Sequence, residues 1–171
     1  MAVMAFAASA QLYLGGEAGV WRDNADARTT ATIMPEIGYN LSEKFAIGTT
    51  VGWNHVHTTG INTNLVAFNP YARYTFFKSG IVGIFCDGTA GFGAGKTSYK
   101  NGGDSDTAWT WQLGFRPGVS VKVSERFSLV AHLGFLGYMG ANDAAKAAGY
   151  DDQWGLRLNG NDVTFGFYYN F

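Results

Sequence analysis

The chain has 171 residues, a formal net charge of −1 and only 15% charged residues, compared with about 25% in a typical soluble domain. This length fits one compact domain, and the near-neutral charge excludes the basic surface of a nucleic-acid-binding protein. The single cysteine, Cys86, excludes an internal disulfide and a thiolate metal cluster. Hydrophobic residues make up 47% of the chain, so much of the folded surface is expected to face something other than water.

The N-terminal residues 1–10, MAVMAFAASA, are apolar and end in Ala8-Ser9-Ala10. Small residues after an apolar run are typical of the site that signal peptidase cleaves. Since the basic start of a complete signal peptide is missing, we predict a residual signal peptide over residues 1–10 and one domain over residues 11–171. The alternative is an ordinary apolar N-terminus or first strand.

Beyond residue 10, apolar residues alternate with small or polar residues in eight segments. Successive side chains of a β-strand point to opposite faces, so this period of two predicts strands. Each segment is near the ~9–11 residues that cross a bilayer as a tilted strand, whereas no run reaches the ~18 apolar residues of a membrane helix. The predicted strands are, in chain order, residues 12–22, 30–40, 45–54, 65–77, 81–95, 109–121, 127–135 and 162–171.

The connections between these strands alternate in length. Three are short, at residues 40–44, 78–80 and 122–126, and four are long, at residues 22–29, 55–64, 96–107 and 140–161. Short turns on one side of the membrane and long loops on the other are typical of outer-membrane barrels. We therefore predict an all-β, eight-stranded antiparallel up-and-down transmembrane β-barrel, with its turns and both termini in the periplasm.

The three prolines occupy matching places in this pattern. Pro35, Pro70 and Pro117 precede the start of the next predicted strand by 10, 11 and 10 residues. Proline has no backbone N–H and cannot donate to a sheet ladder. We expect a bulge or an unpaired position at each proline, near the periplasmic rim.

The distribution of charge indicates which face meets lipid. All six lysines lie in turns, in loops or at their borders, whereas a soluble barrel would scatter lysines along its wet face. The face rich in glycine, threonine and asparagine is therefore placed inside the barrel. An eight-stranded barrel is just wide enough inside to be filled by side chains, and charges buried there need partners. The predicted interior charge network comprises Glu17, Glu36, Arg73, Asp87, Arg116 and His132, with Tyr71, Gln112 and Tyr138 completing its hydrogen bonds.

Aromatic residues gather at the ends of the predicted strands, as the girdles of membrane barrels do. We expect Trp53, Trp109 and Trp111 to mark the outer rim. The periplasmic rim is expected to carry Tyr39, Phe45, Phe76, Phe127, Tyr169 and Phe171.

Two stretches resemble a known family. The C-terminal VTFGFYYNF, with Phe165, Phe167, Tyr169 and Phe171 at every second position, resembles the signature by which the outer-membrane assembly machinery recognises its substrates. The stretch MPEIGYNLSEKFAIGTTVGW resembles the hairpin of the OmpA/OmpX-like barrel superfamily. The resemblance covers residues 11–171 and implies an outer-membrane location in a Gram-negative cell, eight strands and folding by the assembly machinery.

The sequence offers weak candidates for chemistry. His55 and His57 lie in NHVHTTG, which we interpret as a polar loop near the outer rim, with no serine nearby for a hydrolytic site. Two histidines without a third ligand make a poor metal site. The glycines of GFGAGKTS miss the spacing of a phosphate-binding loop and fit a strand under close packing. We therefore predict no catalytic residue, no metal and no cofactor.

Three functions remain open. The first is a barrel without enzymatic activity that presents extracellular loops for membrane integrity, adhesion or partner binding. The second is a narrow porin for ions or small solutes, and the third is an enzyme that modifies lipid A. The expected partners are outer-membrane lipid and lipopolysaccharide, the assembly machinery, and a loop partner or larger membrane complex, with no nucleic acid.

Overall fold

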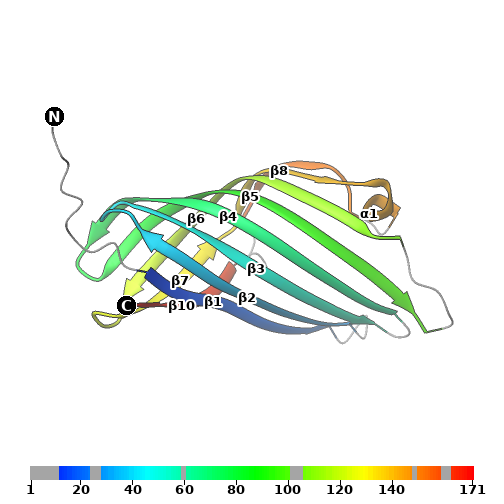
Figure 1. Ribbon diagram of the computed structural model, residues 1–171, viewed down its shortest axis with the longest axis horizontal. Helices are drawn as coiled ribbons and strands as arrows, with labels where there is room; N and C mark the ends of the chain where they lie inside the picture. Colours follow the sequence, from blue (N-terminus) through cyan, green and yellow to red (C-terminus); the bar gives the residue numbers. More distant parts are fainter. Residues whose placement is uncertain (1–11, 24–27, 59–60, 101–105, 148–149, 159–162) are drawn as a thin grey trace.

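The computed structural model describes residues 12–23, 28–58, 61–100, 106–147, 150–158 and 163–171. Long antiparallel strands wrap around a common axis, and one short helix lies near one end (Figure 1). No helix in these ranges is long and apolar enough to cross a membrane. The elements are β1 Leu12–Asp23, β2 Arg28–Asn40, β3 Phe45–Thr58, β4 Ile61–Ser79, β5 Val82–Tyr99, β6 Ala108–Lys122, β7 Phe127–Leu133, β8 Phe135–Ala141, α1 Asp143–Ala147, β9 Gln153–Arg157 and β10 Val163–Asn170.

These strands form the predicted closed eight-stranded barrel, which confirms the fold class. Each of β1 to β6 pairs antiparallel with the next strand in the chain. β6 pairs with β7 near one end and with β8 near the other, so β7 and β8 are two halves of the seventh barrel strand. β9 pairs with β8 and β10 pairs with β7, which makes them the two parts of the eighth strand. β1 pairs with β10 and closes the barrel.

The two ends of the barrel differ. Short connections at 41–44, 80–81 and 123–126 lie at one end, which we call the turn end (Figure 1). The start of β1 and the C-terminus lie there too, since the Phe171 amide donates to the Leu12 carbonyl at 3.1 Å. We call the opposite end, where α1 lies, the loop end.

Large apolar side chains point outward all around the barrel. Leu113, Phe115 and Phe165 are 67%, 56% and 71% exposed. Along β5, by contrast, every second residue from Gly83 to Gly95 is buried inside. This arrangement inverts the pattern of a soluble protein and fits a wall that faces hydrocarbon.

A break at Gly134 corrects part of the sequence interpretation. The alternation through residues 127–135 predicts Phe135 outward and Tyr138 inside, but Phe135 is 7% exposed and Tyr138 is 42% exposed. Gly134 has a φ of 119°, a conformation that favours glycine, and it separates β7 from β8. The register against β6 changes by one residue across it, which moves the following side chains to the opposite face.

The prolines lie where the ladder is interrupted on one side, as predicted, but they lie within the strands and not near the rim, since Pro70 is nine residues before the end of β4 at Ser79. Pro35 is paired with β1 but has no partner on β3, and Pro70 is paired with β3 but has none on β5. Pro117 is paired with β5 and lies where β6 changes its partner from β8 to β7. The missing N–H of each proline therefore costs no ladder hydrogen bond.

The strands extend further toward the loop end than the sequence predicts. The expected loop over 55–64 is mostly a hairpin, because β3 continues to Thr58 and β4 begins at Ile61. β5 continues to Tyr99 in the same way. The expected connection over 140–161 contains α1 and β9. Residues that we expected in loops, His55 and His57 among them, therefore lie on the barrel wall.

Candidate functional site

The barrel lumen holds the main polar cluster. Arg73 and Asp87 face each other across β4 and β5, and Asp87 faces Arg116 across β5 and β6. The Arg73 guanidinium donates from Nε to Asp87 Oδ1 at 2.7 Å and from Nη2 to Asp87 Oδ2 at 2.8 Å. This two-bond geometry is the strongest form of a carboxylate–guanidinium pair.

His132 joins this pair to the first strand. Its Nδ1 lies 2.6 Å from Glu17 Oε1 and its Nε2 lies 3.0 Å from Asp87 Oδ2. Each ring nitrogen therefore faces a carboxylate oxygen, and His132 bridges Glu17 and Asp87.

Glu36 is held mainly by tyrosines. Tyr71 and Tyr168 both donate to its carboxylate, Tyr168 at 3.0 Å, and Arg73 Nη2 lies 3.7 Å from it. Arg73 Nη2 also donates to the Tyr168 hydroxyl at 2.9 Å, and Tyr13 is hydrogen-bonded to Tyr71. The Tyr168 hydroxyl thus links Glu36 to the Arg73–Asp87 pair.

The lumen network contains acidic and basic side chains in equal number. The structure brings together all six residues of the predicted network, three with carboxyl groups, two with guanidiniums and one with an imidazole. Glu17, Glu36, Arg73, Asp87 and His132 are buried, and Arg116 is half-buried. Arg116 is the loosest member, since its Nη2 lies 3.8 Å from Glu17 Oε2. The network crosses the lumen from β1 to β4.

Sequence reasoning missed three aromatic members of this cluster. Tyr13 and Tyr168 lie in the lumen with ring centroids 4.9 Å apart, and the Phe85 ring lies 4.0 Å from the Arg73 guanidinium carbon. Phe85 is fully buried. Phe85 lies two residues before Asp87 and therefore on the same face of β5. This spacing could have predicted that the Phe85 ring points into the lumen.

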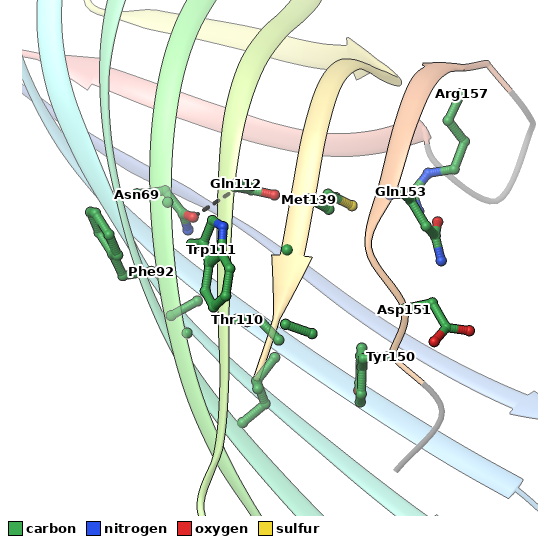
Figure 2. Close-up of a pocket in the computed structure, with 16 residues that line it drawn as sticks. Asn69, Phe92, Thr110, Trp111, Gln112, Met139, Tyr150, Asp151, Gln153 and Arg157 are labelled. Atoms are coloured by element: carbon green, nitrogen blue, oxygen red, sulfur yellow. Dashed lines mark hydrogen bonds between the residues drawn. The ribbon is translucent and has the colours of Figure 1, made fainter. Parts of the chain in front are cut away.

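Figure 2 shows a cavity of about 340 Å³. It is lined by residues of β4, β5, β6, β8 and β9, together with Tyr150 and Asp151, which precede β9. Its lining residues on β4, β5 and β6 lie nearer the loop end than Arg73, Asp87 and Arg116 of the same strands. Gln112 Nε2 donates to Asn69 Oδ1 at 3.0 Å, and Asn69 Nδ2 donates to Thr50 Oγ1 at 3.2 Å. Gln153 and Arg157 lie across the cavity from this amide pair (Figure 2).

The glycines of GFGAG make room for the cavity's amide wall. A Cβ on Gly91 would lie 2.2 Å from Asn69 Oδ1, and one on Gly93 would lie 2.6 Å from Thr110 Oγ1. These close approaches agree with the interpretation of GFGAG as a tightly packed strand and not a phosphate loop.

His55 and His57 lie on the outer wall of β3, outside the lumen. His55 Nδ1 is 2.8 Å from Asn64 Oδ1, and His57 Nδ1 is 2.6 Å from Asn62 Oδ1. Both partners are on β4, and neither ring contacts a serine or a carboxylate in the described ranges. The prediction that the two histidines lie in a loop is therefore wrong, because the β3–β4 hairpin extends beyond the apolar wall.

The aromatic residues of the C-terminal stretch form one outward row. Phe165, Phe167, Tyr169 and Phe171 are all exposed, and the Phe167 ring stacks on Phe127 at 5.7 Å. The predicted residual signal peptide, residues 1–10, lies outside the described residues.

The fold is shared with solved outer-membrane barrels. Neisserial surface protein A is 14% identical, with 94% of this chain and 95% of that chain covered and a TM-score of 0.53. Ail, the attachment invasion locus protein of Yersinia pestis, is 15% identical, with 95% and 97% covered and a TM-score of 0.49. At such identities the likeness to Neisserial surface protein A shows the fold alone.

No curated protein matches the sequence significantly. The outer membrane protein beta-barrel domain family, in contrast, matches residues 1–171. The interior polar network, the apolar outer wall and this match agree with one another. The chain belongs to the outer membrane protein beta-barrel domain family, and its location is the outer membrane.

Proposed function

We propose that this protein is a closed outer-membrane barrel without enzymatic activity, which presents its loop end outside the cell for membrane integrity, adhesion or partner binding. The observation that carries the proposal is the network of Glu17, His132, Asp87, Arg73 and Glu36 across the lumen. In this orientation the turn end and both termini lie in the periplasm.

The network is hard to open because its charges satisfy one another. A permeating ion would have to separate Arg73 from Asp87 or His132 from Glu17. Removing one partner from a buried pair costs roughly 3–5 kcal/mol, since the other charge is left uncompensated. A solute would meet this barrier as well as the bulk of the Phe85 and Tyr168 rings.

Single-channel recording in planar bilayers tests the closed lumen. We expect the wild-type protein to show no conductance steps and the double variant R73A/D87A to show them, because it removes the central pair and leaves no single buried charge from it. The matched control is N69A, which changes the cavity on the loop side and leaves the network intact. Regular steps from the wild-type protein would refute the closed state.

A narrow porin is the second candidate. It is favoured by the cavity of about 340 Å³ in the loop half of the barrel, and by the loosely held Arg116. If the network rearranges to admit ions, the charge-swapped variants R73E and R116E are expected to change the cation-to-anion selectivity of a wild-type current. The closed barrel predicts that there is no wild-type current to change.

The non-enzymatic part of the proposal is supported by the surroundings of His55 and His57. Each ring is hydrogen-bonded to an asparagine instead of an acid or a nucleophile. Mass spectrometry of lipid A from cells with and without the protein is expected to show the same acyl pattern. Loss or gain of an acyl chain that depends on the protein would contradict this part of the proposal while leaving the conductance result untouched.

A further inference from the structure

The side chains that point into the barrel change in size along its length. On β5 the inward residues are Phe85 and Asp87 in the turn half but Gly91 and Gly93 in the loop half, and all four are buried. On β4 the loop half contributes the small residue Ala67. The interior of an eight-stranded barrel is just wide enough for side chains to fill it. Because these residues are small, the loop half is left hollow, and the cavity of about 340 Å³ lies there.

The amide pair of Gln112 and Asn69 is directional. Gln112 Nε2 donates to Asn69 Oδ1, and Asn69 Nδ2 donates in turn to Thr50 Oγ1, so the orientation of each amide group is fixed. Gln112 Oε1 is left as the acceptor at the end of this chain of hydrogen bonds, and it points away from Asn69 toward Met139 (Figure 2). No side chain of the described residues donates to it. The pair therefore presents an acceptor to the cavity, beside the second N–H of Gln112.

The opposite wall of the cavity depends on the break at Gly134. Beyond the break, Phe135 pairs with Arg157 and Met139 pairs with Gln153. Residues directly opposite each other in an antiparallel pair lie on the same face of the sheet, and Phe135 is buried in the lumen. Gln153 and Arg157 therefore lie on the lumen face of β9, across the cavity from the amide pair (Figure 2). The change of register thus brings a further carboxamide and a guanidinium to the cavity.

The mouth of the cavity is held by neighbouring elements. Tyr150 and Asp151 line the cavity and are exposed, so the cavity reaches the protein surface there. The Tyr150 amide donates to the Ala145 carbonyl of α1 at 3.0 Å, and the Asp152 carboxylate accepts from the Ala141 amide of β8 at 3.0 Å. These bonds order the backbone before a ligand binds, so less conformational entropy is lost on binding.

The chemistry of the lining favours a neutral ligand with several hydroxyl groups. Its charged groups are the carboxylate of Asp151 and the guanidinium of Arg157, which balance each other. An acyl chain would leave the carboxamides without partners, which is costly. A hydroxyl group both donates and accepts, so one ligand can satisfy the N–H and the C=O groups of the carboxamides together. The Tyr150 ring offers a flat apolar face at the mouth, suited to the C–H face of a sugar ring.

We infer that this cavity binds a neutral sugar, the terminal residue of a glycan outside the cell. Its volume lies at the lower end of the range of about 300–1,000 Å³ found for ligand pockets, which suits a terminal sugar ring and leaves the rest of the glycan outside. Gln112, Gln153 and Thr110 bind the hydroxyl groups of the sugar, and Tyr150 packs against its ring. The inference deepens the proposed function and rests on it for one point, that the loop end faces outside the cell.

Saturation-transfer difference NMR tests the site, because it detects weak binding of sugars. The probes are the methyl glycosides of glucose, galactose, mannose and N-acetylglucosamine, and the protein is folded in a detergent without a sugar headgroup. We expect at least one probe to bind the wild-type protein. A67L is expected to abolish this binding, because leucine fills the cavity and leaves every polar group in place. Q112L is expected to weaken it about tenfold, the effect of a lost hydrogen bond whose partners are left unpaired.

V66L is the matched control, because Val66 precedes Ala67 in β4 but is exposed on the outer wall. It is expected to bind the sugar as the wild-type protein does. Heat-dependent migration on gels checks that each variant is folded. Absence of binding by every probe, or unchanged binding in both A67L and Q112L, would contradict the site. Stronger binding of methyl glucuronide, an anion, or of free alanine, a zwitterion, would contradict the neutral ligand.

Adhesion of sugar-coated beads tests the source of the ligand. Beads that carry the sugar identified by NMR on a flexible linker are expected to adhere to intact cells with the wild-type protein and not to cells with A67L. Binding of the free glycoside without adhesion of the beads would contradict the assignment to a glycan. The NMR experiment needs neither a bilayer nor a current, so conductance by the wild-type protein would refute the closed lumen and leave the sugar site in place.

Discussion

At the scale of single residues, the lumen depends on glycines that face large rings. A Cβ on Gly38 would lie 2.1 Å from Tyr13 Cζ, and one on Gly118 would lie 2.4 Å from Phe85 Cζ. These glycines let aromatic side chains lie flat against the neighbouring strand. Gly118 thereby supports the charged network, because it makes room for the Phe85 ring on which the Arg73 guanidinium stacks.

The variant G118A is expected to destabilise the barrel. Its Cβ would also lie 2.9 Å from the Ala131 carbonyl oxygen, so displacement of the Phe85 ring alone does not relieve the clash. Overpacking of this kind costs about 1–3 kcal/mol. Urea unfolding in lipid vesicles measures it. The control is G52A on β3, whose Cβ would meet its neighbours at 3.6 Å, an ordinary contact, and equal stability of the two variants would argue against this account.

An exposed ion pair outside the membrane wall gives a prediction about pH. Lys146 Nζ donates to Asp152 Oδ2 at 2.7 Å, and the Ala141 amide donates to Asp152 Oδ1 at 3.0 Å. Both bonds favour the ionised carboxylate and lower the pKa of Asp152, with Lys146 as the larger cause. Any stability from this pair is therefore present above the ordinary pKa of aspartate and is lost as pH falls through the lowered value.

We expect K146M to raise the pKa of Asp152 toward its ordinary value. The carboxyl chemical shift of Asp152, followed by NMR as a function of pH, measures this change. The backbone hydrogen bond from Ala141 remains, so a small depression of the pKa should persist. An unchanged titration curve in K146M would show that the ion pair does not form in solution.

The sequence largely predicts which residues point into the lumen, because successive residues of one strand point alternately inward and outward. Glu17, Arg73 and Asp87 share a face with glycine and threonine, and their opposite charges indicate pairing. Tyr138 was misplaced, since a single glycine with positive φ reverses parity and nothing in the surrounding alternation announces it. The aromatic partner Phe85 was missed because ring packing depends on contacts across strands.

At the scale of the elements, the eighth strand is the least regular and closes the barrel. Its β9 part pairs with β8, and its β10 part pairs with both β7 and β1. The sequence predicts only the β10 part, because β9 and α1 lie in what was interpreted as a long loop. The β3–β4 hairpin escaped detection for a related reason. Its tip carries polar residues on both faces, so the apolar alternation that predicts strands is lost there.

We expect F171D to reduce assembly of the protein into the outer membrane severalfold. Phe171 ends the outward aromatic row, and its amide bonds to Leu12 where the first and last strands meet. A charge there would interrupt the row that the assembly machinery is proposed to recognise. The folded fraction is measured by heat-dependent migration of outer-membrane extracts on gels. W154A is the control, since Trp154 is 86% exposed on β9 and lies outside the row, and equal loss in both variants would refute a special role for the terminus.

At the scale of the whole molecule, the composition predicts the architecture because the outside of a membrane barrel faces hydrocarbon while its inside is polar. The outer wall is apolar and the lumen is polar, so the low charged fraction and the placement of lysines in connections predicted the architecture. The cavity was not predictable, because its volume depends on how β8 and β9 follow the wall after the break at Gly134. Which partner meets the loop end is likewise a matter of surface chemistry that the fold does not determine.

The orientation of the whole barrel is testable with cysteine labelling. In a C86S background, we expect a cysteine in place of Lys100 at the loop end to react with a membrane-impermeant maleimide on intact cells. A cysteine in place of Ser124 at the turn end is expected to react only after the outer membrane is permeabilised, because short turns face the periplasm in such barrels. The reverse pattern would place the loop end in the periplasm and contradict the proposed orientation.

The contact between Glu17 and His132 joins positions 115 residues apart in the chain. Burial of either group alone in hydrocarbon is costly. A partly inserted sheet that contains one group without the other would leave a polar side chain unpaired in the membrane. We therefore expect insertion to coincide with the meeting of the first and seventh strands, and not to proceed one hairpin at a time.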